Sequence, residues 1–304
     1  MNALEITGLC KSYKGKKNVS IAALTDVDLV VASGEVFGFL GPNGAGKSTA
    51  IKIFMGLIKP SSGNALVNGV PVSDSAARRK IGYLPENPSF YDFLTAKEYL
   101  FFVGKTFGMT EVKINEESER VLRLMEIYEA SDRPIRGYSK GMVQRLGLAQ
   151  ALLHDPELYI LDEPMSGLDP LGRALVKDII KDLKARGKTV FFSTHITADV
   201  EIVCDRLGVI VAGKLVSTDR VEHILQRGVE GYLVQVSKLE AVEDIFSAFS
   251  SVEKAQGVKE IYVPRDKFNE FAGKVVKAGG EIVLIEPKRK DIEAFLLDVV
   301  SKSL

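Results

Sequence analysis

The sequence predicts an α/β fold with a largely parallel sheet over most of its length, followed by a small α+β unit. Between about residues 5 and 219, short apolar runs alternate with longer segments of helical period. The clearest apolar runs, 36–40, 158–161 and 189–192, each end at a polar motif. Because open α/β sheets bind ligands at the carboxyl ends of their strands, the three motifs are expected to meet at one crevice.

Composition is that of an ordinary globular protein. The chain has 304 residues, 46% hydrophobic and 26% charged, which suffices for a buried core and leaves no room for extensive disorder. Forty basic residues balance forty acidic ones, so the chain lacks the positive excess that binds a phosphate backbone. Nucleic acid is therefore not an expected partner. The only cysteines, Cys10 and Cys204, have no metal-site or disulfide spacing and are expected to be small buried residues.

Membrane-spanning and targeting segments are not expected. No stretch approaches the 18 or more apolar residues of a membrane span, and residues 1–17 have no apolar core of a signal peptide. The chain is therefore expected in the cytosol.

A glycine-rich loop fits the phosphate-binding pattern GxxxxGK[ST], between the apolar run 36–40 and a helix expected over 50–57. Glycines let successive backbone N–H groups turn toward phosphate oxygens, and the helix start adds partial positive charge. Lys47 would reach the β- and γ-phosphates, and Ser48 would ligate magnesium. The loop consists of Gly41, Pro42, Asn43, Gly44, Ala45, Gly46, Lys47, Ser48 and Thr49.

Two adjacent carboxylates, Asp162 and Glu163, end the apolar run 158–161. Side chains alternate along a strand, so one carboxylate suits the magnesium shell and the other suits polarising an attacking water. Alone, such a pair is more often a strand end exposed to water. The phosphate loop upstream favours the catalytic interpretation.

Two weaker signals lie near the same edge. His195 follows the run 189–192 and could contact the γ-phosphate, although a single histidine is usually structural or on the surface. Ser139 precedes a helical pattern over 143–153, where a hydroxyl and backbone amides suit an anion. On its own this signal is weak, because a serine at the beginning of a helix is ordinarily an N-cap.

A helical insertion is expected over about 95–155. Thr95 and Glu98 have capping-box spacing at its start. The aromatic side chains that follow are expected to pack in the core or, alternatively, to form part of a docking surface for a partner. They are Tyr99, Phe101, Phe102 and Phe107.

The main domain is predicted to span 1–227 and a small accessory domain 228–304. A hairpin at 212–214 and a short helix over 221–225 precede the boundary near Gly228. Beyond it, strand patterns alternate with helical ones and carry no recognisable chemistry. The expected strands are 232–236, 261–263 and 282–285, and the expected last helix is 291–300.

Taken together, these motifs resemble the nucleotide-binding subunit of ABC transporters over about residues 4–225. The resemblance implies a P-loop cassette with a helical subdomain, ATP and Mg²⁺ as ligands, and a homodimer that sandwiches two ATP molecules. It also implies in-line attack of water on the γ-phosphate, with Lys47 and magnesium neutralising charge and His195 steadying the transferred group.

By the same resemblance, five residues receive roles. Tyr13 looks like the aromatic that stacks on adenine, and Glu163 looks like the general base. Ser139 and Gly141 look like the signature that contacts the γ-phosphate of ATP on the opposite subunit. Asp169 looks like the loop that couples the two sites.

Two motifs depart from the family pattern. The signature at 138–142 reads YSKGM where LSGGQ is usual, which keeps only the serine and the second glycine. The loop at 81–86 ends in Glu86 where the family has glutamine, and a carboxylate can still ligate magnesium. Glu86 and the tail 285–295 look similar to exporter-type ATPases that carry a C-terminal accessory domain.

The resulting expectation is a cytoplasmic ATPase, peripheral on the inner face of the cell membrane, that powers export through separate integral membrane permease subunits. The alternative is a soluble ABC-family ATPase acting in DNA repair or translation without a permease. A binding-only module is a third alternative, and it requires that the acidic pair be inert.

Overall fold

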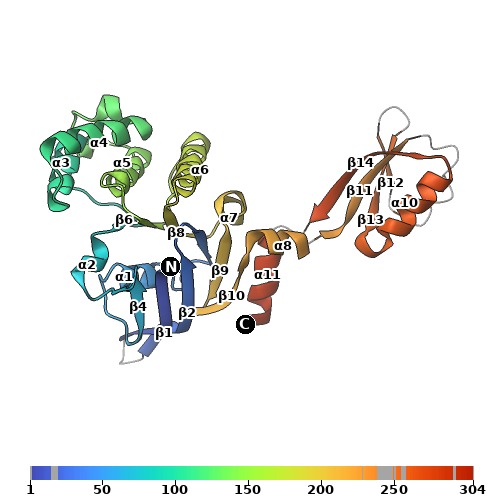
Figure 1. The fold of residues 1–304 in the computed structure, drawn as a ribbon, viewed down its shortest axis with the longest axis horizontal. Coiled ribbons are helices and arrows are strands. Elements are labelled where there is room, and N and C mark those ends of the chain that lie inside the picture. Colours follow the sequence, from blue (N-terminus) through green and yellow to red (C-terminus); the bar gives the residue numbers. More distant parts are fainter. Residues whose placement is uncertain are drawn as a thin grey trace. The chain divides into compact units, whose positions relative to one another are not determined.

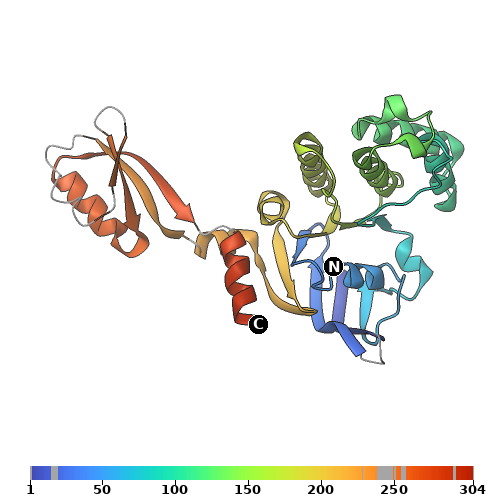
Figure 2. The ribbon, with the colours of Figure 1, turned by 180° about the vertical axis from the view of Figure 1, so that it is seen from behind.

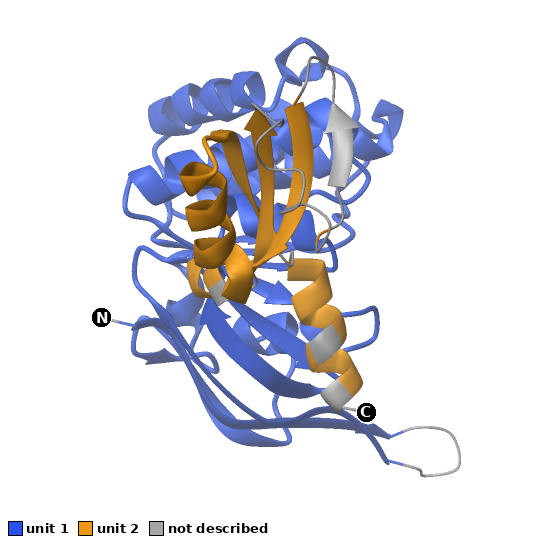
Figure 3. Ribbon diagram, turned by 90° about the vertical axis from the view of Figure 1, so that its right-hand side faces the viewer, with its two compact units in different colours: residues 1–221, 303 blue, residues 222–302, 304 orange. Residues whose placement is uncertain are grey.

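The chain folds into two compact units, 1–221 and 222–302, which Figure 3 distinguishes by colour. We call them the first and the second unit. The predicted boundary residue, Gly228, lies outside the described residues. The computed structural model describes residues 2–14, 20–227, 229–237, 249, 251–254, 258–289 and 292–303.

The first unit is built on a six-stranded sheet with the order β10-β9-β3-β8-β7-β6. All neighbours run parallel except β10, which pairs antiparallel with β9 after the turn at Ala212 and Gly213. The three apolar runs became β3, β7 and β8, so the predicted α/β class is confirmed. The strands are β3 (Val36–Leu40), β6 (Ile81–Leu84), β7 (Leu158–Asp162), β8 (Thr189–Thr194), β9 (Arg206–Val211) and β10 (Lys214–Arg220).

A second, antiparallel sheet in the first unit has the order β2-β1-β4-β5. The sequence pattern did not predict this separate sheet. Its strands alternate buried and exposed positions, with Leu4, Ile6 and Leu9 of β1 buried, as expected for a sheet that covers a core on one face. The strands are β1 (Asn2–Lys14), β2 (Ser20–Ala32), β4 (Ser62–Val67) and β5 (Val70–Pro71).

Helices of the first unit flank the sheets, and α3, α4 and α5 lie together as a group in both ribbon views (Figures 1 and 2). The capping box of Thr95 and Glu98 starts α3, as predicted. Helix α1 begins at Lys47, three residues earlier than expected, directly after the glycine-rich loop. The helices are α1 (Lys47–Phe54), α2 (Ser75–Arg78), α3 (Ala96–Thr106), α4 (Glu111–Leu124), α5 (Lys140–Leu152), α6 (Pro170–Ala185) and α7 (Thr197–Val203).

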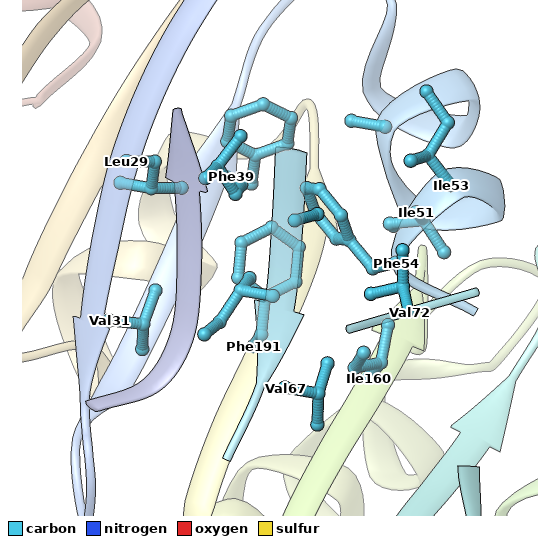
Figure 4. Packing of buried hydrophobic residues seen from close by; sticks show 14 of the residues in the cluster. Leu29, Val31, Phe39, Ile51, Ile53, Phe54, Val67, Val72, Ile160 and Phe191 are labelled. Carbon is cyan, nitrogen blue, oxygen red and sulfur yellow. The ribbon is translucent and has the colours of Figure 1, made fainter. Parts of the chain in front are cut away.

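An aromatic cluster holds the phosphate loop's flanking elements together. The Phe191 ring of β8 lies 5.8 and 5.4 Å from the rings of Phe37 and Phe39 on β3, and 5.5 Å from the Phe54 ring of α1. Figure 4 shows Phe39, Phe54 and Phe191 within this core. All four rings are fully buried, and truncating one such ring typically costs about 3–5 kcal/mol. The loop between β3 and α1 is therefore anchored at both ends.

The second unit has a four-stranded antiparallel sheet with the order β12-β13-β11-β14. Its small core joins the inner faces of β11 and β13 to Phe271 and Val275 of α10. The three predicted strands of this region are present. The elements are α8 (Val221–Arg227), β11 (Val229–Ser237), β12 (Ser251–Lys254), β13 (Val258–Pro264), α10 (Phe268–Lys277), β14 (Glu281–Arg289) and α11 (Ile292–Ser303).

Within the described parts of the chain, the helices are all too short or too polar to cross a bilayer. Cys204 is buried as expected, whereas Cys10 is half-buried and its sulfur accepts a hydrogen bond from the Asp26 backbone N–H. That bond lies at an irregularity in the β1–β2 pairing, where a purely apolar residue could not satisfy the amide.

Candidate active site

The glycine-rich loop turns from the end of β3 into α1, and its shape requires glycine. Gly46 has φ of 111°, which L side chains rarely adopt, and a Cβ on Gly41 would lie 2.4 Å from the carbonyl oxygen of Ile210. Gly46 also occupies the N-cap of α1, so no side chain caps that helix. The first amides of α1 are therefore left for a ligand anion.

A cavity of about 240 Å³ opens at this loop. It brings together the phosphate loop, Glu86 from the end of β6 and Glu163 from the end of β7. Carboxyl ends of neighbouring parallel strands thus meet at one crevice, as predicted. Its lining residues are Ala23, Asn43, Gly44, Ala45, Gly46, Lys47, Ser48, Thr49, Glu86 and Glu163.

Lys47 is the buried cation of the cavity. Its Nζ donates to the carbonyl oxygens of Gly41 at 2.7 Å and Pro42 at 3.3 Å, and lies 3.5 Å from Glu163 Oε1. Only 6% of Lys47 is exposed. A buried ammonium next to one carboxylate is well placed to exchange these contacts for phosphate oxygens.

Glu163 joins the second and third motifs. Its two carboxylate oxygens lie 3.1 and 3.0 Å from His195 Nδ1, so the histidine after β8 contacts the acidic pair after β7. The Glu163 backbone has φ of 50°, in the left-handed region. The carboxylate therefore lies between an ammonium and an imidazole at the mouth of the phosphate loop.

Asp162 is almost completely buried, and its Oδ1 accepts a 2.5 Å hydrogen bond from the Ser193 hydroxyl. Burial raises the pKa of the Asp162 carboxyl. The hydroxyls of Ser193 and Ser48 lower the pKa in part, and the charges of Glu86 and Glu163 raise it. Carboxylates crowded in this way favour binding of a cation.

The donor set suits Mg²⁺, which prefers hard oxygen ligands and keeps several non-protein ones. Ser48 and Asp162 supply a hydroxyl and a carboxylate side by side. Among the described residues, no group of three or more His, Cys, Asp or Glu side chains forms a metal site. A magnesium ion here would therefore depend on phosphate oxygens and water for its other ligands.

Other predicted site residues lie outside the cavity lining. The Tyr13 ring on β1 is 42% exposed, with Lys11 Nζ 5.2 Å from its centroid. Ser139 caps α5 by accepting from the Met142 N–H at 3.3 Å, and it remains exposed. Gly141, two residues further on, is half-buried.

Asp169 caps α6 by accepting from the Gly172 N–H at 2.9 Å. Ser139 is therefore the N-cap of α5, as the capping interpretation expects, and a helix start capped in this way can still present backbone amides to a partner. The roles of Tyr13, Ser139, Gly141 and Asp169 toward ATP stay predictions.

Three residues of the site region were not anticipated. Ala23 lines the cavity from β2, in the sheet that the sequence did not reveal. Ser193 binds both Asp162 and the Glu163 backbone, and its place two residues before His195 was an available signal. Gln144 of α5 donates a hydrogen bond to the carbonyl oxygen of Glu163, in the loop after β7, and nothing in its sequence context indicates a role at the site.

Uncapped helix-start amides and a buried ammonium beside an acidic pair are suited to a polyphosphate whose terminal bond is hydrolysed. Fold and cavity together define a P-loop nucleoside triphosphatase. Comparison with known proteins narrows this class. The family described as ABC transporter matches residues 24–166.

Relatives and solved structures agree with that match. The ABC transporter ATP-binding protein YhcH of Bacillus subtilis is 34% identical, and the alignment covers 99% of this chain and 93% of that protein. The Nod factor export ATP-binding protein I of Rhizobium meliloti is 36% identical over 77% of this chain and 69% of its own length. A dimeric ATP-binding cassette, MJ0796 bound to ADP and Pi, superposes with a TM-score of 0.67 and 25% identity over 72% of this chain and 98% of that one.

The chain belongs to the ABC transporter family as an ATP-binding subunit, and it is an ATPase. The predicted cassette fold and its ATP ligand are thereby confirmed. The alternatives of a repair or translation ATPase and of a binding-only module do not fit this membership.

Proposed function

We propose that the chain is the ATP-hydrolysing subunit of an exporter, that it works as a homodimer with Mg²⁺, and that it docks on separate permease subunits at the cytoplasmic face of the membrane. The observation that carries the hydrolytic part is the position of Glu163, whose carboxylate lines the phosphate cavity within 3.0 Å of His195 and 3.5 Å of Lys47.

In the proposed reaction, a water oxygen forms a bond to the γ-phosphorus while the bond to the ADP oxygen breaks. Glu163 accepts the proton of that water, and His195 holds the carboxylate and then the transferred phosphate. Lys47 leaves its two backbone carbonyls for the β- and γ-phosphate oxygens. Ser48, Asp162 and Glu86 would hold Mg²⁺, which supplies charge neutralisation at the phosphates when bound.

Dimerisation is supported by the exposed signature residues. Ser139 and Lys140 at the start of α5 are exposed, and they do not line the cavity of their own subunit. A second copy that brings its α5 start to this cavity would complete the site with amides and a hydroxyl. The MJ0796 cassette, to which this chain is similar, is dimeric with ADP and Pi bound, which supports a dimer of this chain.

Export and permease docking rest on two observations. The relatives include Nod factor export and linearmycin resistance ATP-binding proteins. An exposed aromatic patch of Tyr91, Phe93 and Phe102 also precedes and joins α3, with neighbouring ring centroids 6.0 and 6.4 Å apart. Such a patch on the surface of the first unit suits an apolar helix of a partner.

The test of the hydrolytic role is Glu163→Gln. We expect ATP binding to remain, turnover to fall about 100- to 10,000-fold, and an ATP-bound dimer to accumulate in analytical ultracentrifugation. Glu201→Gln on α7 is the matched control, because Glu201 is exposed and does not line the cavity. Full turnover by Glu163→Gln would overturn the assignment of the base.

The test of docking is Phe93→Ser, with Val112→Ser on α4 as the control at an equally exposed apolar position. Loss of co-purification with a membrane protein in Phe93→Ser alone, at unchanged ATPase activity, supports the patch as the docking surface. Recovery of the wild-type chain with ribosomes or DNA, and not with a membrane protein, would contradict the transport assignment.

A further inference from the structure

Glu163 holds its carboxylate in the cavity on a strained backbone. Its φ of 50° belongs to the left-handed region, which costs a residue with a Cβ free energy that the surroundings must supply. A base held in this way depends on whatever fixes its peptide groups. The contacts of the Glu163 backbone are therefore as relevant to catalysis as the contacts of its side chain.

One side of this backbone is fixed by the central sheet. The Glu163 N–H donates to both the carbonyl oxygen and the hydroxyl of Ser193, at 3.2 and 3.0 Å. The same hydroxyl donates to Asp162. Ser193 belongs to β8, which pairs directly with β7, so this attachment is rigid.

The other side is fixed by a side chain from α5. The Gln144 amide nitrogen donates to the carbonyl oxygens of Glu163 at 3.3 Å and Pro164 at 3.2 Å. Gln144 is 3% exposed and does not line the cavity among the described residues. One buried amide group thus holds two consecutive carbonyls of the catalytic loop and makes no approach to the ATP site itself.

Helix α5 begins at the signature residues, so Gln144 lies three residues, less than one turn, after Gly141. The far half of the helix is attached elsewhere: Gln150 accepts a 2.7 Å hydrogen bond from the Tyr99 hydroxyl of α3. Through Gln144 the start of α5 is therefore hydrogen-bonded to the Glu163 loop, while the end of the helix is hydrogen-bonded to α3.

We propose that Gln144 is a positioning residue for Glu163 that links the signature of each subunit to its own general base. This rests on the proposed function, in which the signature of one subunit contacts ATP bound to the other. The signature and the base of one chain then serve different ATP sites. When the signature of a chain contacts the ATP bound to the partner, the start of α5 would be held in place. Through Gln144 this contact would also hold Glu163 in place at the ATP bound to its own chain.

The test compares Gln144→Met with Gln150→Met, which remove the same group from the two halves of one helix. We expect kcat of Gln144→Met to fall about 10- to 100-fold, because loosening a catalytic group by an ångström costs about that much. The KM for ATP is expected to stay within about twofold, since Gln144 does not line the cavity. Gln150→Met is expected to keep the wild-type kcat.

A second variant and a double variant separate positioning from folding. Gln144→Glu keeps the volume but turns an acceptor toward two carbonyls, so it is expected to lower kcat at least as much as Gln144→Met. In the Glu163→Gln background, Gln144→Met is expected to leave ATP-driven dimerisation unchanged, which a general folding defect would reduce.

The outcomes distinguish this inference from the proposed function. Normal kcat in both Gln144 variants, with Glu163→Gln inactive, overturns only the role of Gln144. Equal losses in Gln144→Met and Gln150→Met, with raised KM and weaker dimerisation, also overturn it. Full activity of Glu163→Gln overturns the base, and the role of Gln144 falls with it.

Discussion

The two ends of the central parallel sheet handle charge in opposite ways. At the strand starts, charges are matched: Glu35 before β3 pairs with Arg206 of β9 at 3.0 Å, and Lys188 before β8 pairs with Asp155 and Glu157 before β7. At the carboxyl ends, Glu163 pairs with Lys47 and His195, whereas the buried carboxylate of Asp162 has no ion-pair partner in the part of the chain that the structure describes.

This difference teaches where a ligand is needed. Matched pairs at the strand starts stabilise the fold and leave nothing to bind. At the carboxyl ends, the carboxylates outnumber the nearby basic side chains and the first amides of α1 have no cap. The carboxylates therefore suit a cation, and the amides suit a polyphosphate. Changes at the two ends should therefore separate into effects on ligand binding and effects on stability.

The largest expected effect is at the ligand end. Lys47→Ala should weaken ATP binding about 100-fold, since a charge-assisted contact to phosphate is worth up to about 3 kcal/mol. Calorimetric titration with ATP measures the affinity, and Lys188→Ala at the other end is the control. Equal loss of ATP affinity in both variants would break the comparison.

The next effect is at the strand starts. Glu35→Ala should lower the free energy of unfolding by about 3 kcal/mol, because it leaves Arg206 and the Ala32 N–H without their 8% exposed acceptor. Glu35→Gln keeps the acceptor for Ala32 and should cost about 1 kcal/mol. Urea unfolding measures both. A change in ATP affinity without a change in stability would contradict the division between the ends.

A smaller effect depends on pH. Burial lowers the pKa of His154, just before β7, to about 4, against the opposing influence of the Ile81 backbone and of Asp155. The unfolded chain binds this proton near its ordinary pKa, so it holds more protons than the folded chain between about pH 6.5 and 4. Stability should therefore fall on acidification.

Between pH 7 and 5 we expect a loss of about 1 kcal/mol, reduced from the full linkage value because part of the ring meets solvent. His154→Phe keeps the stacking on Phe107, whose ring centroid is 3.7 Å away, and should flatten the pH profile. Urea midpoints of both proteins at the two pH values provide the measurement. An unchanged slope in the variant would assign the pH dependence elsewhere.

The smallest effect is expected at an exposed pair of the strand-start end. Arg186 and Asp155 form an ion pair with side chains 40% and 48% exposed. Arg186→Gln should cost about 0.5 kcal/mol, and 1 M salt should reduce that difference. A loss of unfolding free energy as large as that of Glu35→Ala would show that the burial of an ion pair does not determine how much it stabilises this fold.

Most of the carboxyl-end edge could be predicted from sequence because its residues lie next to strands with strong apolar runs. Lys47, Asp162, Glu163 and His195 follow directly from strand position, which fixes where side chains meet in a parallel sheet. Ala23 could not be found in this way, because β2 belongs to an antiparallel sheet whose alternating pattern was weaker than the apolar runs.

Gln144 and the backbone of Glu163 were beyond sequence reasoning for a different reason. A contact between α5 and the loop after β7 depends on how a helix from the insertion packs, and no local pattern encodes that distance. The early start of α1 at Lys47 is a milder case. The start of this helix depends on Gly46, whose left-handed backbone ends the loop three residues earlier than the apolar pattern alone suggests.

The left-handed backbone of Glu163 has an evolutionary consequence. Glycine at position 163 would relieve the backbone strain by about 1 kcal/mol. Selection for stability alone would therefore favour a substitution that removes the proposed general base. Screens for heat-tolerant variants of this protein should therefore include an activity assay, because one of the positions where a glycine would relieve backbone strain is the proposed general base.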